Sequence, residues 1–277
     1  MMNKPRFNLV SLSGGKDSTA MLLAMIERNV PISMILFCDT GLEFPAMYRH
    51  IDKLNSYVRD TLQMEITVVQ PEYPFEYYFK DIPIKRKADS PVIQKYGEQP
   101  NGYGWAGSRM RWCTSRLKDM PRERFLRPYR EQYDIYEYVG IAADEQYRLE
   151  RKRNQDEQHI HPLVEWNMSE ADCLQYCYDC GFNWEGLYEK FKRVSCWCCP
   201  LQSLDELRVL YRDYPNLWKQ LGIWDEITWR KFRADYSVKE LQIRFDMEAE
   251  WLKNGKSIRS REFYRALRER LGKEGAL

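Results

Sequence analysis

The sequence has no long apolar run: none of its stretches approaches the roughly 18 residues that a membrane-spanning helix requires. The N-terminus also lacks the pattern of a signal peptide, because its first long apolar run leads into a glycine-rich loop. These two absences predict a cytoplasmic protein that does not contact a membrane. In that compartment cysteines serve as thiols or metal ligands rather than as disulfides, so the eight cysteines are candidates for those roles. The formal net charge of +2 does not by itself indicate a nucleic-acid partner.

The glycine-rich loop, residues 13–19, stands between an expected strand and an expected helix. Residues 7–12 are apolar and too few for a helix, whereas residues 20–26 have a broad apolar face. The two glycines of the loop, Ser13-Gly14-Gly15-Lys16-Asp17-Ser18-Thr19, allow a tight turn and a close approach to a ligand. The loop amides, the positive end of the helix dipole and the Lys16 charge predict an anion site. The spacing is not that of a Walker A loop.

Two further expected strands end in polar residues. The apolar run 32–38 leads into Asp39 and Thr40, and the stretch 138–145 ends in acidic residues. Because ligands of open α/β sheets bind beyond the carboxyl ends of the strands, we expect these groups beside the loop. Arg148 and the cations at 151–153 follow as a basic cluster suited to phosphate or sulfate.

These stretches, together with Ser195-Cys196-Trp197-Cys198-Cys199-Pro200, make the chain resemble the phosphoadenosine phosphosulfate (PAPS) reductase-like family of PP-loop proteins. The resemblance implies an adenine nucleotide α-hydrolase-like fold, which is a doubly wound, mostly parallel α/β sheet covered by helices. It also implies that ATP with Mg²⁺ is bound and that the chemistry occurs at the α-phosphate. The nucleotide-binding residues expected from the loop and the strand ends are Ser11, Ser13, Gly14, Gly15, Lys16, Asp17, Ser18, Thr19, Asp39, Thr40, Gly140, Asp144 and Arg148.

One departure from the family decides between its reactions. Sulfonucleotide reductases carry a Glu-Cys-Gly-Leu-His-like motif near the C-terminus, whose cysteine attacks the sulfate sulfur, but this chain has no cysteine after Cys199. We therefore expect an ATP pyrophosphatase that adenylates an acceptor, in sulfur transfer to a nucleic acid or a small molecule, with a sulfur donor protein as partner. A sulfonucleotide reductase and a non-catalytic nucleotide- or nucleic-acid-binding module are the alternatives.

Three residues are the candidates for catalysis: Lys16 and Asp17 of the loop, and Cys113. Cys113 lies in a cation-rich stretch, residues 109–118, and neighbouring Arg and Lys side chains lower the pKa of a thiol and favour the nucleophilic thiolate. The alternative is a packed cysteine at the start of a helix.

The other cysteines form two C-x-x-C units. Cys177 and Cys180 are separated from Cys196 and Cys199 by 15 residues, which is the spacing of four-cysteine zinc sites. Four thiolates suit either Zn²⁺ or a [4Fe–4S] cluster. By resemblance to cluster-binding reductases, Cys113 with Cys196, Cys199 and either Cys177 or Cys180 is a rival set. Cys173 lies one helical turn before Cys177, in a helix that we expect to begin after Ser169 and to stop at Gly181.

The breaks in the pattern predict a nucleotide-binding α/β domain over residues 1–165, a small Cys-rich metal-binding lobe over 166–205 and an α-helical region over 206–277. Within the first domain, residues 71–111 are rich in proline and glycine and read as a long loop. From residue 251 onward the chain carries eight Lys or Arg and three Asp or Glu. A terminal helix, residues 261–271 with Ser260 as its N-cap, would present this charge either to a nucleic acid or acidic protein or simply to solvent.

Overall fold

The computed structural model describes residues 4–96, 100–150 and 155–272, and the chain forms two compact units. The sheet unit comprises residues 1–75 and 113–197, and the helical unit comprises residues 76–112 and 198–277. The chain therefore leaves the sheet unit after residue 75, returns to it at residue 113 and leaves it again after residue 197. Residues 166–197, most of the lobe that the sequence suggests, belong to the sheet unit.

The sheet unit is built on five parallel strands in the order β3-β2-β1-β4-β5, which confirms the predicted doubly wound parallel sheet. The strands are β1 (Arg6–Leu12), β2 (Met34–Cys38), β3 (Ile66–Val69), β4 (Asp134–Val139) and β5 (His159–Ile160). The helical segments are α1 (Lys16–Glu27), α2 (Pro45–Leu62), α4 (Trp112–Thr114, whose first residue belongs to the helical unit), η2 (Ser115–Asp119), α5 (Met120–Gln132), η3 (Ala143–Arg148), α6 (Pro162–Glu165), α7 (Glu170–Asp179), η5 (Trp184–Gly186) and α8 (Leu187–Lys190).

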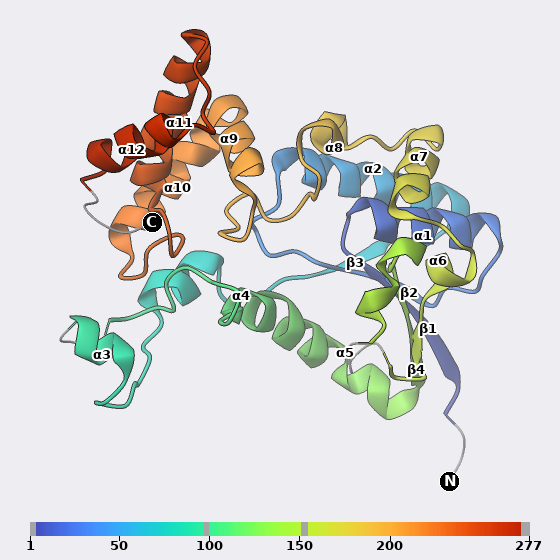
Figure 1. Ribbon diagram of the computed structural model, residues 1–277. Coiled ribbons are helices and arrows are strands. Elements are labelled where there is room, and N and C mark those ends of the chain that lie inside the picture. Colours follow the sequence, from blue (N-terminus) through green and yellow to red (C-terminus); the bar gives the residue numbers. More distant parts are fainter. Residues whose placement is uncertain (1–3, 97–99, 151–154, 273–277) are drawn as a thin grey trace. The chain divides into compact units, whose positions relative to one another are not determined.

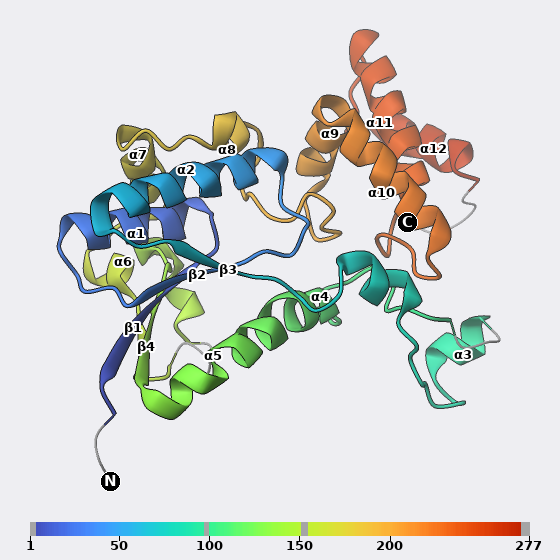
Figure 2. The same ribbon diagram turned by 180° about the vertical axis from the view of Figure 1, so that it is seen from behind.

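Both faces of the sheet are covered, which suits the apolar sequence of β2. Figures 1 and 2 show α1 and α2 over one face and α5 over the other. In β1, Val10 pairs with Ile35 of β2 and with Tyr138 of β4, and it is fully buried. The core on the α5 side consists of Leu9, Met34, Leu36, Val69, Leu126 and Ile135.

Helix α7 begins and ends where the sequence predicts. Ser169 is its N-cap in a capping box with Asp172, and Gly181 follows the helix with a φ of +83°. The helix packs along α1 and buries Cys173 and Cys177 completely. The predicted Cys-rich segment is therefore anchored to the sheet unit by an apolar helix face.

The helical unit combines the C-terminal helices with the proline- and glycine-rich stretch. Its segments are η1 (Tyr77–Asp81), α3 (Pro91–Tyr96), α9 (Leu204–Asp213), α10 (Pro215–Ile227), α11 (Val238–Lys253) and α12 (Arg261–Arg270). The helical C-terminal region is thus confirmed, and α12 starts after Ser260 as expected. Within the described ranges, no helix of either unit is both long enough and apolar enough to cross a bilayer.

Trp105 joins the two parts of the helical unit. Its ring is 1% exposed and packs on Phe79 and Phe232 at centroid distances of 4.7 and 4.9 Å. Its indole N–H donates to Asp225 at 3.0 Å. The same carboxylate accepts the backbone N–H groups of Phe232 at 2.9 Å and Val238 at 2.7 Å. One carboxylate on α10 therefore ties the stretch around Trp105 to the start of α11.

We expect Asp225→Ala to lower the free energy of unfolding of the helical unit by roughly 3 kcal/mol, because three donors lose a charged acceptor. Urea unfolding followed by tryptophan fluorescence measures this loss. Glu226→Ala is the matched control: it removes the same charge from the next, exposed position of α10 and should change the value by less than about 0.5 kcal/mol. Equal losses in the two variants would contradict the role of Asp225.

Candidate nucleotide site

The candidate site lies where the strand order of the sheet reverses. From β1 the chain proceeds to β2 and β3 on one side, whereas β4 and β5 lie on the other side. Residues 13–15 connect the end of β1 to α1 at this point. In open α/β sheets ligands bind in the crevice outside such a reversal.

Gly14 makes the turn between β1 and α1 possible. Its φ is +79°, a conformation that other residues rarely adopt. A Cβ atom here would also lie 2.7 Å from Met47 Sδ, so the turn has no room for a side chain. The predicted role of this glycine in a tight turn is confirmed.

The turn places hydrogen-bond donors at the start of a 12-residue helix. The N–H groups of Asp17 and Ser18 belong to the first turn of α1 and have no hydrogen-bond partner in the part of the chain that the structure describes. The hydroxyls of Ser13 and Ser18 lie 2.9 Å apart beside them. Free amides and the positive end of a helix dipole together favour an anion.

Lys16 is held close to two carboxylates. Only 8% exposed, it lies with its Nζ 2.9 Å from Asp17 and 3.3 Å from Glu170. Burial lowers the pKa of Lys16, but the two carboxylates outweigh burial and leave the pKa above its ordinary value. Burial raises the pKa of Asp17, and the charges of Glu170 and Glu145 add to that rise. Negative charge is therefore in excess around Lys16.

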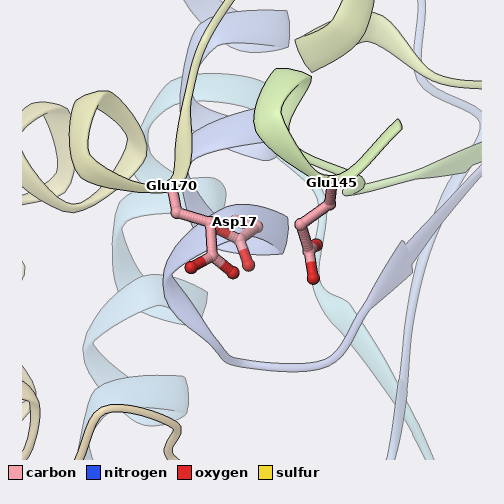
Figure 3. A group of neighbouring side chains, drawn as sticks. All are labelled: Asp17, Glu145 and Glu170. Atoms are coloured by element: carbon pink, nitrogen blue, oxygen red, sulfur yellow. The ribbon is translucent and has the colours of Figure 1, made fainter. Parts of the chain in front are cut away.

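Three carboxylates, those of Asp17, Glu145 and Glu170, lie close together (Figure 3). One oxygen from each of Asp17, Glu145 and Glu170 lies within 4.8 Å of the others. Across residues 4–96, 100–150 and 155–272 this is the single group of three or more His, Cys, Asp or Glu ligands at such distances. Carboxylate oxygens are the ligands that Mg²⁺ prefers, so the group fits a divalent cation.

Sequence reasoning missed Glu145 and Glu170 as site residues. It selected Asp144, but the Asp144 carboxylate accepts the backbone N–H of Glu170 at 2.9 Å and thereby supports the start of α7. Glu145 also pairs with Arg148, which places that predicted residue beside the acidic group. The acidic pair at 144–145 was a signal in the sequence, whereas Glu170 gave none, because only the packing of α7 on α1 brings it to the loop. The cations at 151–153 lie outside the described residues.

Several side chains from distant segments contact the glycine-rich loop, residues 13–19, and fix its position. The Trp184 indole N–H donates to the Gly14 carbonyl at 2.8 Å, and the Lys16 N–H donates to the Tyr188 hydroxyl oxygen at 2.8 Å. His50, 5% exposed, stacks on Trp184 at 4.4 Å and lies 3.1 Å from the Thr19 hydroxyl. The loop is therefore fixed by groups far from it in sequence.

Gly140 contributes by close packing. It follows β4, and a Cβ atom there would lie 2.8 Å from the Cα and N atoms of Ser18. The backbone after β4 is therefore in direct contact with the first turn of α1. Ser11 has a different environment, since its hydroxyl donates to Glu137 of β4 at 2.5 Å.

Asp39 and Thr40 lie at the end of β2, where their side chains order the following turn. The Asp39 carboxylate accepts the N–H of Gly41 at 2.8 Å and the hydroxyl of Tyr48 at 2.9 Å. Thr40 is 3% exposed, and its hydroxyl lies 3.4 Å from Glu43. Their predicted contact with a nucleotide stays a prediction.

A second polar cluster surrounds Lys118 on η2. Its Nζ lies 3.7 Å from Glu43, and the Cys196 thiol lies 3.8 Å from the same carboxylate. Burial lowers the pKa of Lys118, but Cys196, Glu43, Cys38 and Cys113 raise it and prevail. The candidate nucleophile Cys113 and the candidate ligand Cys196 therefore both act on one lysine.

The four predicted metal ligands have different environments. The buried thiol of Cys177 donates to the Lys16 carbonyl at 3.5 Å, and burial raises its pKa, which disfavours the thiolate that a metal needs. Cys180 is exposed, Cys196 lies near Lys118, and Cys199 belongs to the helical unit. The four-cysteine site stays a prediction, and these contacts give Cys177 a packing role beneath the loop.

A parallel sheet whose strand order reverses beside a glycine turn, a helix N-terminus and a lysine defines an α/β protein with an anion site at the reversal point of its sheet. The chain belongs to the family of the phosphoadenosine phosphosulfate reductase domain, whose model matches residues 8–202. An uncharacterized protein of Methanocaldococcus jannaschii is 24% identical over 255 residues, which are 89% of this chain and 44% of that protein. The chain spans about half the length of the curated relatives it matches, 44% of this one and 53% of a second.

Two solved structures are also similar. The PAPS reductase of Candida auris, in a phosphate complex, gives a TM-score of 0.42 at 16% identity over 71% of this chain and 83% of that one. The U34-tRNA thiolase of Methanococcus maripaludis, with its [4Fe–4S] cluster, gives 0.36 at 17% identity over 88% and 73%.

We expect Gly140→Ala to destabilise the sheet unit by about 1–3 kcal/mol, because the new methyl group forces two backbone segments apart. Gly222→Ala in α10 is the matched control: a Cβ atom there meets nothing within 4 Å, so the change should stabilise its helix by about 0.5–1 kcal/mol. Urea unfolding of both variants gives the two values. Changes of the same sign would contradict the close approach at Gly140.

A pH dependence follows from His50. Burial lowers its pKa to about 3, so the folded state keeps it neutral while the unfolded chain binds a proton below about pH 6.5. As the pH falls from about 6 to about 4, His50 therefore lowers the free energy of unfolding of the sheet unit by about 1.4 kcal/mol for each pH unit. Urea unfolding at several pH values should show this slope in the wild type and a shallower one in His50→Gln. Parallel slopes would show that His50 is protonated in the fold.

Proposed function

We propose that the protein is an ATP pyrophosphatase, which cleaves ATP at the α-phosphate and transfers the adenylyl group to an acceptor as a step in sulfur transfer. The observation that carries the proposal is the pairing of the anion site at the start of α1 with three carboxylates beside Lys16. Amides and a lysine suit a pyrophosphate, and the carboxylates suit the Mg²⁺ that accompanies ATP.

The charge balance supports a nucleotide bound with a metal ion. Asp17, Glu145 and Glu170 bring three negative charges against the two cations of Lys16 and Arg148, so a negative charge is left over that opposes a bare polyphosphate. Asp17, Glu145 and Glu170 would hold Mg²⁺, which when bound neutralises phosphate oxygens and polarises the phosphorus. The reductase alternative has less support, because the chain has no cysteine after Cys199 to attack a sulfate sulfur.

The chain's own residues have distinct parts in this reaction. The N–H groups of Asp17 and Ser18 and the Lys16 ammonium bind the pyrophosphate end of ATP and stabilise the charge that builds on it. An acceptor oxygen attacks the α-phosphorus, forming one P–O bond while the bond to the bridging oxygen breaks and pyrophosphate leaves. A sulfur nucleophile from a donor protein then forms a bond to the acceptor carbon and displaces AMP.

The cluster around Lys118 is the proposed place for sulfur chemistry. Cys113 and Cys196 both interact electrostatically with this lysine, and cysteine sulfur is a nucleophile as well as a ligand of soft metals. We assign them as a nucleophile or as ligands of Zn²⁺ or a [4Fe–4S] cluster. Metal analysis of anaerobically purified protein, wild type against Cys196→Ser, distinguishes a ligand from a free thiol.

We expect Lys16→Ala to reduce the rate of pyrophosphate release from ATP on the order of 100-fold or more, since a donor to the leaving group is lost. The assay measures pyrophosphate and inorganic phosphate separately, with Mg²⁺ and anaerobically purified protein. Lys239→Ala, an exposed lysine on α11, is the matched control and should retain the rate.

Two results would overturn the proposal. Phosphate release without pyrophosphate would place cleavage at the γ-phosphate. Absence of ATP cleavage, together with sulfite release from PAPS, would assign the protein to the reductases despite its missing C-terminal cysteine.

A further inference from the structure

The C-terminal helix α12 carries a continuous cationic stripe. Successive members of the stripe are three, one and three residues apart, so they share one face of the helix. They are Arg261, Tyr264, Arg265 and Arg268. Phe263 and Leu267 point elsewhere and are 0% and 2% exposed, whereas Tyr264 is 42% exposed. The helix thus buries its apolar face in the helical unit, exposes Arg261, Tyr264 and Arg265, and leaves Arg268 half-buried.

The cations of this region are not neutralised by carboxylates. None of Lys253, Lys256, Arg259, Arg261, Arg265, Arg268 and Arg270 forms an ion pair among residues 4–96, 100–150 and 155–272. By contrast, three exposed arginines of the sheet unit all have carboxylate partners: Arg49 with Glu185, Arg59 with Glu65, and Arg124 with Glu72. Arginines that are already ion-paired with carboxylates of the protein attract an anionic partner less strongly than unpaired arginines do.

The arrangement favours a nucleic acid over an anionic membrane. A basic amphipathic helix binds a bilayer by inserting its apolar face, but that face of α12 is already buried. The exposed part of α12 includes a row of arginines interrupted by one aromatic ring, with Glu262 and Glu269 beside that row. Single-stranded nucleic acids are bound by this combination, in which cations follow the phosphates and a ring stacks on a base.

We propose that the face of α12 formed by Arg261, Tyr264, Arg265 and Arg268, called the α12 stripe, binds a single-stranded nucleic acid. The three arginines contact successive phosphates, and the Tyr264 ring stacks on a base between them. The exposed cations Lys253, Lys256 and Arg259, which precede the helix, extend the surface. The inference does not depend on ATP cleavage, because the stripe lies wholly in the helical unit.

The test is fluorescence anisotropy with a labelled single-stranded DNA of mixed sequence, about 20 nucleotides long, at several salt concentrations and without ATP. The triple variant R261Q/R265Q/R268Q should bind the oligonucleotide roughly 100-fold more weakly at about 0.1 M salt. The slope of its log binding constant against log salt concentration should be shallower by about 2, because each of the three phosphate contacts contributes about 0.7. Tyr264→Ala should weaken binding roughly tenfold and leave the salt slope unchanged.

The matched control is R49Q/R59Q/R124Q. It makes the same change in net charge at arginines that are ion-paired, and at about 0.1 M salt their effect is screened beyond about 10 Å. This variant should bind within about threefold of the wild type. Thermal unfolding shows whether each variant folds. If the triple variant does not, Arg265→Gln alone should reduce the salt slope by about 0.7.

The proposal would be overturned if the wild type did not bind the oligonucleotide at about 50 mM salt, or if the two triple variants weakened its binding equally. It would also be overturned if the wild type bound vesicles of anionic lipid as strongly as the oligonucleotide and the α12 stripe variant lost that vesicle binding. Pyrophosphate release measured on the same samples keeps the two proposals separate. The α12 stripe variant should retain it, and Lys16→Ala should retain binding of the oligonucleotide.

Discussion

The left-handed turn at Gly14 fixes the position of every donor at the candidate nucleotide site. With a φ of +79°, it lets β1 run directly into α1, so that the free N–H groups of Asp17 and Ser18 stand at the edge of the sheet. The conformation of the turn is fixed, because Met47 packs against Gly14 and the Trp184 indole N–H donates to the Gly14 carbonyl. A site built on backbone amides depends on such rigidity, since an amide can be aimed only by fixing the chain that carries it.

Charge then decides what this rigid frame can bind. The helix N-terminus attracts an anion, while the carboxylates of Asp17, Glu145 and Glu170 outnumber the cations of Lys16 and Arg148 that pair with them. An anion that carries its own divalent cation satisfies both requirements, and a bare anion satisfies only one. The reactions proposed for this chain differ in whether the nucleotide carries its own divalent cation. The group of Asp17, Glu145 and Glu170 therefore distinguishes between these reactions more sharply than the glycine-rich loop does.

The cysteines divide according to their surroundings. Cys173 and Cys177 on α7 are buried against α1, where burial raises their pKa values and suits them to packing. Cys113 and Cys196 interact electrostatically with the Lys118 ammonium instead. Spacing along the chain groups Cys177 with Cys196, and in the structure the two thiols have different surroundings.

Local patterns in the sequence determined the strands β1 and β2, the glycine turn, the N-caps Ser169 and Ser260 and the helical C-terminal region, because these depend on neighbours within a few residues. Glu145 and Glu170 at the site, the Trp184 and Tyr188 bonds to the loop, and the joining of Trp105 to Asp225 were decided only by the tertiary structure. Each joins segments more than 100 residues apart, such as Gly14 and Trp184, which no local periodicity relates. Packing also determined that α12 buries Phe263 and exposes its arginines, since a charged helix by itself does not reveal which face meets the core.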